Sequence, residues 1–298
     1  MNGILKNSLI RLRSSQPFNA IATSGLKGVF NATHTRPEFV IRHLHRLGRV
    51  EDQLPNGRTL KLNSRADDWV SNQIFWRGWE GYEPETATLF YKLASKSLVT
   101  IDIGAYVGFF TLLAAHANPE GKVVAVEPLA PVFKRLSQNV AYNDLNNVEC
   151  INAALSDRAG SAEFFHIANG LPTSSSLDYE FMKATSDLVS SIVDVTTLDD
   201  LVTSRKLGRV DLVKIDTETT ERDVLRGGIR LLERDRPDVF CEVLAGRAHE
   251  RDLEEILAPL GYHYYLLRRE GPERRTRIEG HPEWLNYLFS VKDVQANF

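Results

Sequence analysis

The sequence predicts an α/β protein built on a mostly parallel sheet with helices on both faces. From residue 97 onward, apolar runs of strand length alternate with amphipathic helical stretches, which is typical of parallel strands joined by crossover helices. The runs are almost wholly apolar, as expected for strands covered on both faces. A chain of 298 residues, 43% hydrophobic and 25% charged, supplies a full-sized core. Disorder, collagen and coiled coil are therefore excluded as descriptions of the whole chain.

The elements can be placed in order along the chain. Five runs are expected to be strands: 98–103, 123–126, 148–155, 210–215 and 239–243. The helices expected between them are 108–117, a helix that starts near Pro131, and 222–232. Segments 262–267 and 285–291, joined by the charged stretch 268–280, suit a closing antiparallel hairpin.

An insertion of about fifty residues, 158–207, separates the third and fourth of these strands. Its strand-like segments 162–167 and 192–196 flank a serine-rich loop. Because a structureless loop of that length is uncommon inside a compact domain, we expect added strands or a flap that faces the substrate.

Charge divides the chain unevenly. Residues 1–61 hold ten Lys and Arg against three acids, a charge of +7, whereas the whole chain carries −3, which leaves −10 for residues 62–298. We therefore expect a basic, partly helical N-terminal segment, 1–74, ahead of an α/β domain, 75–298. The acidic domain argues against a nucleic-acid partner, and the basic segment is a candidate surface for homo-oligomer formation.

Neither export nor membrane insertion is indicated. The longest stretch without a charge, 103–119, contains two glycines, a histidine and an asparagine, and is too short for a span of about 20 apolar residues. The first twenty residues lack an uninterrupted apolar run of signal-peptide length. Two cysteines give neither a disulfide framework nor a zinc site. We expect no membrane span and a cytoplasmic location.

A nucleoside site is predicted where the first two strands end. Residues 101–108 read IDIGAYVG, a strand that runs into a turn where Gly104 allows close backbone approach and Gly108 begins a helix. The spacing is not the G-x-G-x-x-G of dinucleotide sites, which weighs against a nicotinamide-dependent oxidoreductase. Glu127 ends the second strand, where a carboxylate can accept hydrogen bonds from both ribose hydroxyls. Of nucleoside ligands without a pyrophosphate, S-adenosylmethionine is the commonest.

Seven motifs between residues 75 and 291 resemble the FkbM family of S-adenosylmethionine-dependent methyltransferases, mostly O-methyltransferases of natural-product and glycan pathways. They are GYEP at 81–84, IDIGA at 101–105, VEP at 126–128, NAALSD at 152–157, SSSL at 174–177, VTTLD at 195–199 and KIDTE at 214–218. The resemblance implies a Rossmann-like class I methyltransferase fold. Its sheet has seven mostly parallel strands in the order 3-2-1-4-5-7-6, helices on both faces and an insertion between strands 3 and 4.

The resemblance also implies the cofactor contacts. They are Glu83, Asp102, Gly104, Ala105, Tyr106, Glu127, Pro128, Ala153, Asp157 and Asp216. Asp102 and Gly104 would lie along the methionine end, Glu127 would hold the ribose, and segment 152–157 would edge the adenine. Two of these residues keep a structural alternative: Asp157 as a turn residue, and Glu83 at the start of a helix.

Asp216, Glu218 and Glu242 are the candidate catalytic residues, at the carboxyl ends of strands four and five, where ligands sit in open α/β sheets. Methyl transfer to a hydroxyl requires an aligned oxygen and either a proton acceptor or a cation that lowers the hydroxyl pKa. The three carboxylates are therefore candidates for a general base or for ligands of Mg²⁺. The alternative is that a strand-end acid pairs with Lys214 or caps the next helix.

The sequence departs from the family after Glu218, where Thr219 and Thr220 replace the usual glycine and small or aromatic residue. If that glycine serves a positive φ, a β-branched threonine is strained there. Otherwise Thr220 and Asp223 have the spacing of a capping box. The departure leaves open a methyltransferase-like protein that binds without turnover.

Substrate contacts are expected from Ser175 and Ser176 in the insertion and from Arg268 and Arg269 in the charged stretch, where guanidinium groups suit a phosphate or carboxylate. A solvated charged hairpin is the alternative for the arginines. The predicted function is S-adenosylmethionine-dependent O-methylation of a hydroxyl on a small molecule or sugar.

Overall fold

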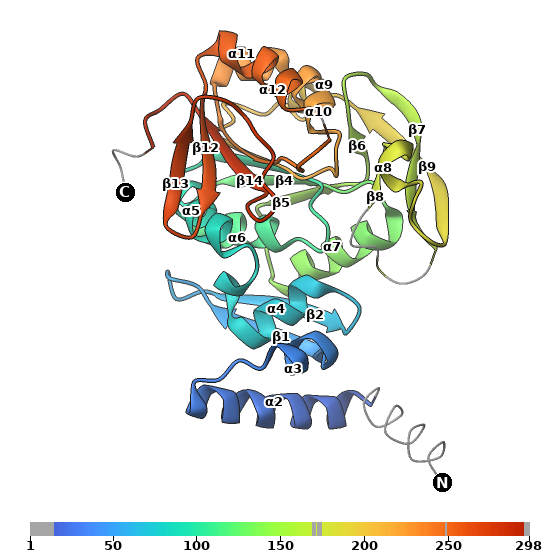
Figure 1. Ribbon diagram of the computed structural model, residues 1–298, viewed down its shortest axis with the longest axis vertical. Helices are drawn as coiled ribbons and strands as arrows, with labels where there is room; N and C mark the ends of the chain where they lie inside the picture. The colour runs from blue at the N-terminus through green and yellow to red at the C-terminus, as the bar shows by residue number, and fades with distance from the viewer. Residues whose placement is uncertain (1–14, 169–170, 172–174, 248, 295–298) are drawn as a thin grey trace. The chain divides into compact units, whose positions relative to one another are not determined.

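The computed structural model describes residues 15–168, 171, 175–247 and 249–294. The chain forms two compact units, Met1–Glu83 and Pro84–Phe298, drawn in Figure 1. The division falls after Glu83, whereas the sequence placed it after residue 74. No helix of the described residues is long and apolar enough to cross a membrane.

The N-terminal unit combines helices with an antiparallel hairpin that the sequence did not predict. Its elements are α2 (Gln16–Thr33), α3 (Glu38–His43), β1 (Leu47–Gln53), β2 (Thr59–Arg65), α4 (Trp69–Arg77) and the 3-10 helix η1 (Trp79–Gly81). Leu60 and Leu62 alternate with more exposed residues along β2, so one face of the hairpin is buried. Ile74 and Trp76 of α4 are also buried in this unit.

The central sheet of the second unit has eight strands in the described part of the chain. In spatial order they are β13 (Gly271–Arg275), β12 (His263–Arg268), β14 (Asn286–Ser290), β11 (Asp238–Glu242), β10 (Leu212–Ile215), β3 (Val99–Ile103), β4 (Lys122–Val126) and β5 (Val148–Ile151). The seven expected strands follow the order 3-2-1-4-5-7-6. The strand count of seven was wrong, because part of the charged stretch 268–280 pairs with β12 as an edge strand, and charged edge strands lack the apolar pattern of buried ones.

Helices cover both faces of this sheet. Figure 1 shows α5 (Pro84–Ala94), α6 (Phe109–Ala117) and α7 (Ala130–Tyr142) on one side, and α9 (Leu198–Ser204), α10 (Glu221–Arg226), α11 (Ile229–Asp235) and α12 (Glu250–Leu257) on the other, with the 3-10 helix η2 (Ala258–Leu260) after α12. The single helix expected at 222–232 is divided at Gly227. A Cβ there would lie 2.1 Å from the carbonyl oxygen of Ser156, so only glycine allows this approach.

The insertion forms a second sheet, which is the first of the two alternatives that the sequence left open. Its strands β7 (Gly160–Ile167), β8 (Ser175–Ser176) and β9 (Leu188–Thr196) join β6 (Ala154–Leu155), which precedes the insertion, in the order β6-β9-β7-β8, and α8 (Tyr179–Met182) follows β8. The expected strand 148–155 is therefore two strands, because Ala154 and Leu155 pair with β9. Ser174 of the serine motif lies outside the described residues.

Candidate active site

The glycine turn after β3 brings the ends of three strands together. Gly104 has φ +77, and a Cβ there would lie 1.8 Å from the carbonyl oxygen of Asp216. The amides of Gly104 and Ala105 both donate to the Val126 carbonyl at 3.0 Å. Glycine is therefore required, and the turn fixes the carboxyl edge of β3 against those of β4 and β10.

Asp102 lies inside this edge. Its carboxylate accepts a 2.6 Å hydrogen bond from the Thr111 hydroxyl of α6, and the residue is 2% exposed. Burial raises its pKa to about 6, opposed by the Thr111 hydrogen bond and by the charge of Lys214. Asp102 thus joins β3 to α6, and its expected contact with the methionine end of a cofactor stays a prediction.

Glu127 is held at the end of β4 by two backbone amides. Its Oε1 accepts from Leu129 at 2.9 Å and its Oε2 from Tyr106 at 3.1 Å. Burial outweighs both hydrogen bonds and raises the pKa of Glu127 to about 8. Tyr106 itself adopts φ +50, and its amide bond to Glu127 brings two of the predicted cofactor residues into contact.

Of the remaining predicted cofactor residues, Pro128 and Ala153 lie beside this edge, whereas Asp157 and Glu83 are not assigned to it. The side chain of Asn152 donates to the carbonyls of Glu127 and Pro128, both at 2.8 Å, which places the buried Ala153 beside this edge. The motif at 152–157 contains this asparagine, but no pattern revealed its bonds. Asp157 is exposed and pairs with Arg158 at 3.5 Å. Glu83 ends the N-terminal unit, and its role stays a prediction.

Lys214 and Asp216 form a largely buried ion pair at the centre of the edge. The Lys214 Nζ lies 2.9 Å from Asp216 Oδ2 and 4.5 Å from the centroid of the Phe110 ring. Carboxylate and aromatic face together compensate the desolvation of a lysine that is 1% exposed. This pairing is the alternative that the sequence left open for a strand-end acid, and it fixes the Asp216 carboxylate beside the Gly104 turn.

The backbone leaves the extended conformation just after β10. Glu218 has φ +55 and Thr219 has φ +90, so residues 214, 216 and 218 do not share one face as an extended strand would require. The threonine at 219 is thus strained, at a cost of about 1–3 kcal/mol.

Glu221 accepts hydrogen bonds from the backbone amides of this turn. One of its oxygens accepts from the amides of Thr217 and Thr219 at 2.9 and 3.2 Å, and burial raises its pKa to about 7. Of the two alternatives for this turn, the capping box at Thr220 and Asp223 is not formed, because the Thr220 side chain makes no cap hydrogen bond. Sequence reasoning missed Glu221, which resembles any first-turn helix acid.

Glu242 ends β11 with a carboxylate oxygen, Oε2, that is buried and has no hydrogen-bond partner among the described residues. Burial and the negative charges of Asp216, Glu218 and Glu221 raise its pKa well above the usual range. Burial thus disfavours the ionised form of Glu242, which is the form that would act as a base or bind a cation. The magnesium set of Asp216, Glu218 and Glu242 is not assembled: within the described ranges, no three His, Cys, Asp or Glu side chains are grouped to hold a metal.

The predicted substrate residues are largely engaged within the protein. Ser176 is fully buried and its hydroxyl donates to the Glu218 carbonyl at 2.6 Å, and a substrate contact by this side chain stays a prediction. Ser175 is half-buried in β8. Arg268 pairs with Glu273 at 2.7 Å, and Arg269 lies over the Trp284 ring at 5.9 Å. Contacts of Ser175, Arg268 and Arg269 with substrate stay predictions.

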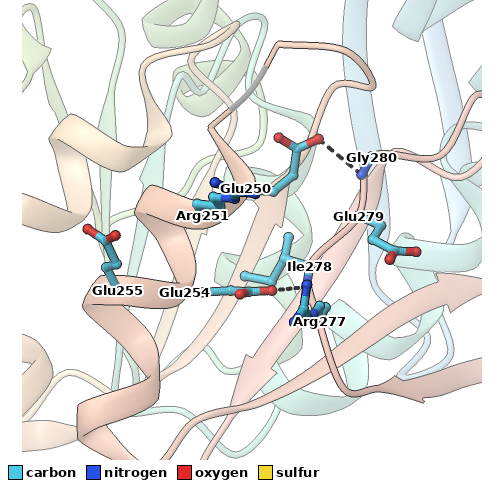
Figure 2. A pocket seen from close by; sticks show the side chains of 8 residues that line it. All are labelled: Glu250, Arg251, Glu254, Glu255, Arg277, Ile278, Glu279 and Gly280. Atoms are coloured by element: carbon cyan, nitrogen blue, oxygen red, sulfur yellow. Dashed lines mark hydrogen bonds between the residues drawn. The ribbon is translucent and has the colours of Figure 1, made fainter.

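An open pocket of about 600 Å³ lies beside α12, where acidic side chains bond the backbone of a loop. Figure 2 shows that two of its acids are used within the protein: Glu254 accepts from the Ile278 amide at 2.6 Å and Glu250 from the Gly280 amide at 3.3 Å. These acids anchor the loop that follows β13, so the edge formed by β3, β4, β10 and β11 is the candidate active site.

An open α/β sheet with a glycine turn and a carboxylate at the ends of neighbouring strands defines the class: a Rossmann-like fold of the class I methyltransferase type. The family model described as methyltransferase FkbM domain matches residues 102–290. The chain belongs to this family, as its motifs predicted.

The curated relatives match this chain over part of their length. The AMB antimetabolite synthetase AmbE of Pseudomonas aeruginosa is 30% identical over 212 residues, covering 60% of this chain and 10% of that protein. Methyltransferase sdnD of Sordaria araneosa is 31% identical over 153 residues, 43% of this chain and 59% of that protein. The chain thus spans less than two thirds of either relative.

Solved structures are similar at low identity. A methyltransferase FkbM from Methylobacillus flagellatus matches with TM-score 0.46 and 16% identity, covering 77% of this chain and 56% of that one. An O-methyltransferase from Bacillus cereus in complex with SAH matches with TM-score 0.43 and 14% identity, covering 70% and 81%.

Proposed function

We propose that this protein transfers the methyl group of S-adenosylmethionine to a hydroxyl oxygen of a small molecule or sugar. The carrying observation is the Glu127 carboxylate, held by the amides of Leu129 and Tyr106 beside the Gly104 turn. A carboxylate accepts hydrogen bonds and donates none when ionised, which suits the two hydroxyls of a ribose. Membership of the FkbM domain family supports the same reaction class.

The chemistry of the edge fits this cofactor. The negative charge of Asp216 raises the pKa of Asp102, Glu127 and Glu242, and Asp216 is itself paired with Lys214. Carboxyl groups at this edge attract a cation when they are ionised. S-adenosylmethionine, when bound, supplies a sulfonium whose methyl group is electrophilic.

The protein's own contribution at the acceptor is to orient the hydroxyl and receive its proton. The Asp216 side chain is 27% exposed and is fixed by Lys214 at 2.9 Å, so it is both accessible and oriented. We assign proton acceptance to Asp216, with Glu218 on the adjoining turn. We assign to Glu242, whose buried Oε2 makes no hydrogen bond among the described residues, a polar contact with the acceptor.

Calorimetry with S-adenosylmethionine and S-adenosylhomocysteine tests the cofactor, and the wild-type protein should bind both. Extract fractions incubated with S-adenosylmethionine carrying a ¹³C-labelled methyl then test the acceptor, because an O-methyl carbon resonates apart from N-methyl and C-methyl carbons. Failure of the wild type to bind either compound would overturn the proposal, and a labelled N-methyl or C-methyl product would overturn the hydroxyl acceptor.

A second candidate function is a methyltransferase-like protein that binds cofactor without turnover, favoured by the strained Thr219. It predicts that S-adenosylmethionine binds but that no S-adenosylhomocysteine is released with any extract fraction.

Self-association through the N-terminal segment is also proposed, supported by the inverted polarity of α2. Asn19 is buried and bonds the His45 carbonyl at 2.9 Å and the Leu47 amide at 2.8 Å. The apolar side chains of Ile21 and Val29 are instead 75% and 55% exposed. The helix is held to its own unit by its polar face, and the opposite apolar face is left for a second copy.

A further inference from the structure

Two residues of the insertion bind the strained turn at the end of β10. The Ser176 hydroxyl donates to the Glu218 carbonyl at 2.6 Å, and the Thr219 hydroxyl donates to Asp178 Oδ2 at 3.1 Å. The two are linked to each other, because the Asp178 amide donates to Ser176 Oγ at 3.0 Å. We call Ser176 and Asp178 the insertion clamp.

Helix α8 extends the same attachment to the neighbouring strand. Asp178 caps α8 by accepting from the Phe181 amide at 3.2 Å. The Phe181 ring in turn packs under the Arg247 guanidinium, 4.6 Å from the ring centroid, in the segment after β11. Thr219, Glu242 and Arg247 line one small pocket of about 10 Å³, room for a single water. The insertion thus contacts the segments that follow both β10 and β11.

The clamp explains why a threonine occupies a position where glycine would be unstrained. A β-branched residue at φ +90 is strained. A hydrogen bond to a charged group can offset such strain, and the Thr219 hydroxyl makes one to Asp178. Glycine cannot supply that hydroxyl, so the departure from the family pattern adds a tether between the insertion and the catalytic edge.

We propose that Ser176, Asp178 and Thr219 are positioning residues that set the direction of the Glu218 carboxylate according to the position of the insertion. An acceptor seated against the insertion then orders the Glu218 turn through the clamp. This inference rests on the proposed function and deepens it, because it assigns the insertion to acceptor recognition and leaves cofactor binding to the edge of β3 and β4.

Two pairs of variants of the full chain test the clamp. Thr219→Val removes the hydroxyl at nearly constant shape, whereas Thr219→Ser retains it. Asp178→Ser keeps an N-cap oxygen for α8 but removes the oxygen that accepts from Thr219. Glu180→Gln is its control on the same helix, since Glu180 is exposed and pairs with Lys183.

Three readouts are compared: hydrogen exchange of segments 175–182 and 216–221, the Kd for S-adenosylhomocysteine, and kcat and KM with the acceptor found by the labelled-methyl assay. We expect Thr219→Val and Asp178→Ser to speed exchange in both segments at least tenfold. The same variants should lower kcat/KM for the acceptor at least tenfold and leave the Kd within twofold. Thr219→Ser and Glu180→Gln should behave as wild type.

Wild-type exchange rates in Thr219→Val and Asp178→Ser would overturn the proposal. So would a loss of cofactor affinity in step with activity, because that describes a fold that has loosened as a whole. If the wild type fails to bind S-adenosylhomocysteine, the proposed function is wrong, while the exchange comparison still decides whether the clamp exists.

Discussion

Glu127 combines a raised pKa with a role that requires its ionised form. Its pKa is about 8 because burial outweighs two amide hydrogen bonds, whereas ribose hydroxyls donate best to a carboxylate. We expect S-adenosylhomocysteine to bind more tightly as the pH rises from 6.5 to 9, since ionised Glu127 then prevails. Calorimetry across this range checks the trend. Glu127→Gln should bind about tenfold or more weakly at alkaline pH and lack the dependence; a variant with the wild-type pH profile would contradict the assignment.

Glu221 links the strained turn to the pH dependence of stability. Its pKa rises from 4.5 to about 7 on folding, so the folded state binds more protons than the unfolded state between those values. The free energy of unfolding therefore falls as the pH rises from 4.5 to 7, by about 3 kcal/mol from this group at 1.36 kcal/mol per pKa unit. Glu221→Gln keeps an acceptor oxygen and should lack this contribution. Urea unfolding of both proteins at pH 4.5 and pH 8 checks it, and parallel pH profiles would count against it.

The turn between β3 and α6 makes the sharpest prediction for a single element. In Gly104→Ala the new Cβ would lie 1.8 Å from the Asp216 carbonyl oxygen, at φ +77, so the edge has to separate. We expect a loss of stability above about 3 kcal/mol, with cofactor binding abolished. Gly208→Ala is the control, because nothing lies within 4 Å of its added Cβ. Equal melting temperatures for the two variants would disprove the close approach.

Which elements the sequence predicts depends on how they are buried. The strands of the central sheet are apolar on both faces, so continuous runs revealed them, whereas β13 carries charges and β1 and β2 are covered on one face only. Asn152 lies in the break between β5 and β6, and its amide donates to the Glu127 and Pro128 carbonyls. No periodicity records such a bond.

The residues of the candidate site were likewise only partly predictable from the sequence. Gly104 and Glu127 could be paired from the sequence because consecutive parallel strands end at one edge of a sheet. The contact of Ser176 with Glu218 joins residues 42 apart, and only the folded insertion brings them together. The raised pKa of Glu242 likewise follows from burial and from neighbouring carboxylates, which composition does not encode.

At the scale of the whole molecule, variants in α2 test whether the basic N-terminal unit mediates self-association. A helix that buries Asn19 and Thr23 and exposes Ile21 and Val29 presents apolar area that a second copy would remove from water. We expect the wild type to sediment as a dimer or larger species at micromolar concentration, and Ile21→Glu combined with Val29→Glu to sediment as a monomer with unchanged circular dichroism. Asn31→Glu is the control, since it adds a negative charge at an exposed polar position of the same helix. A monomeric wild type would refute self-association. Binding of the exposed apolar face of α2 to anionic vesicles would then be tested, because residues 1–37 carry five Lys and Arg and no acid.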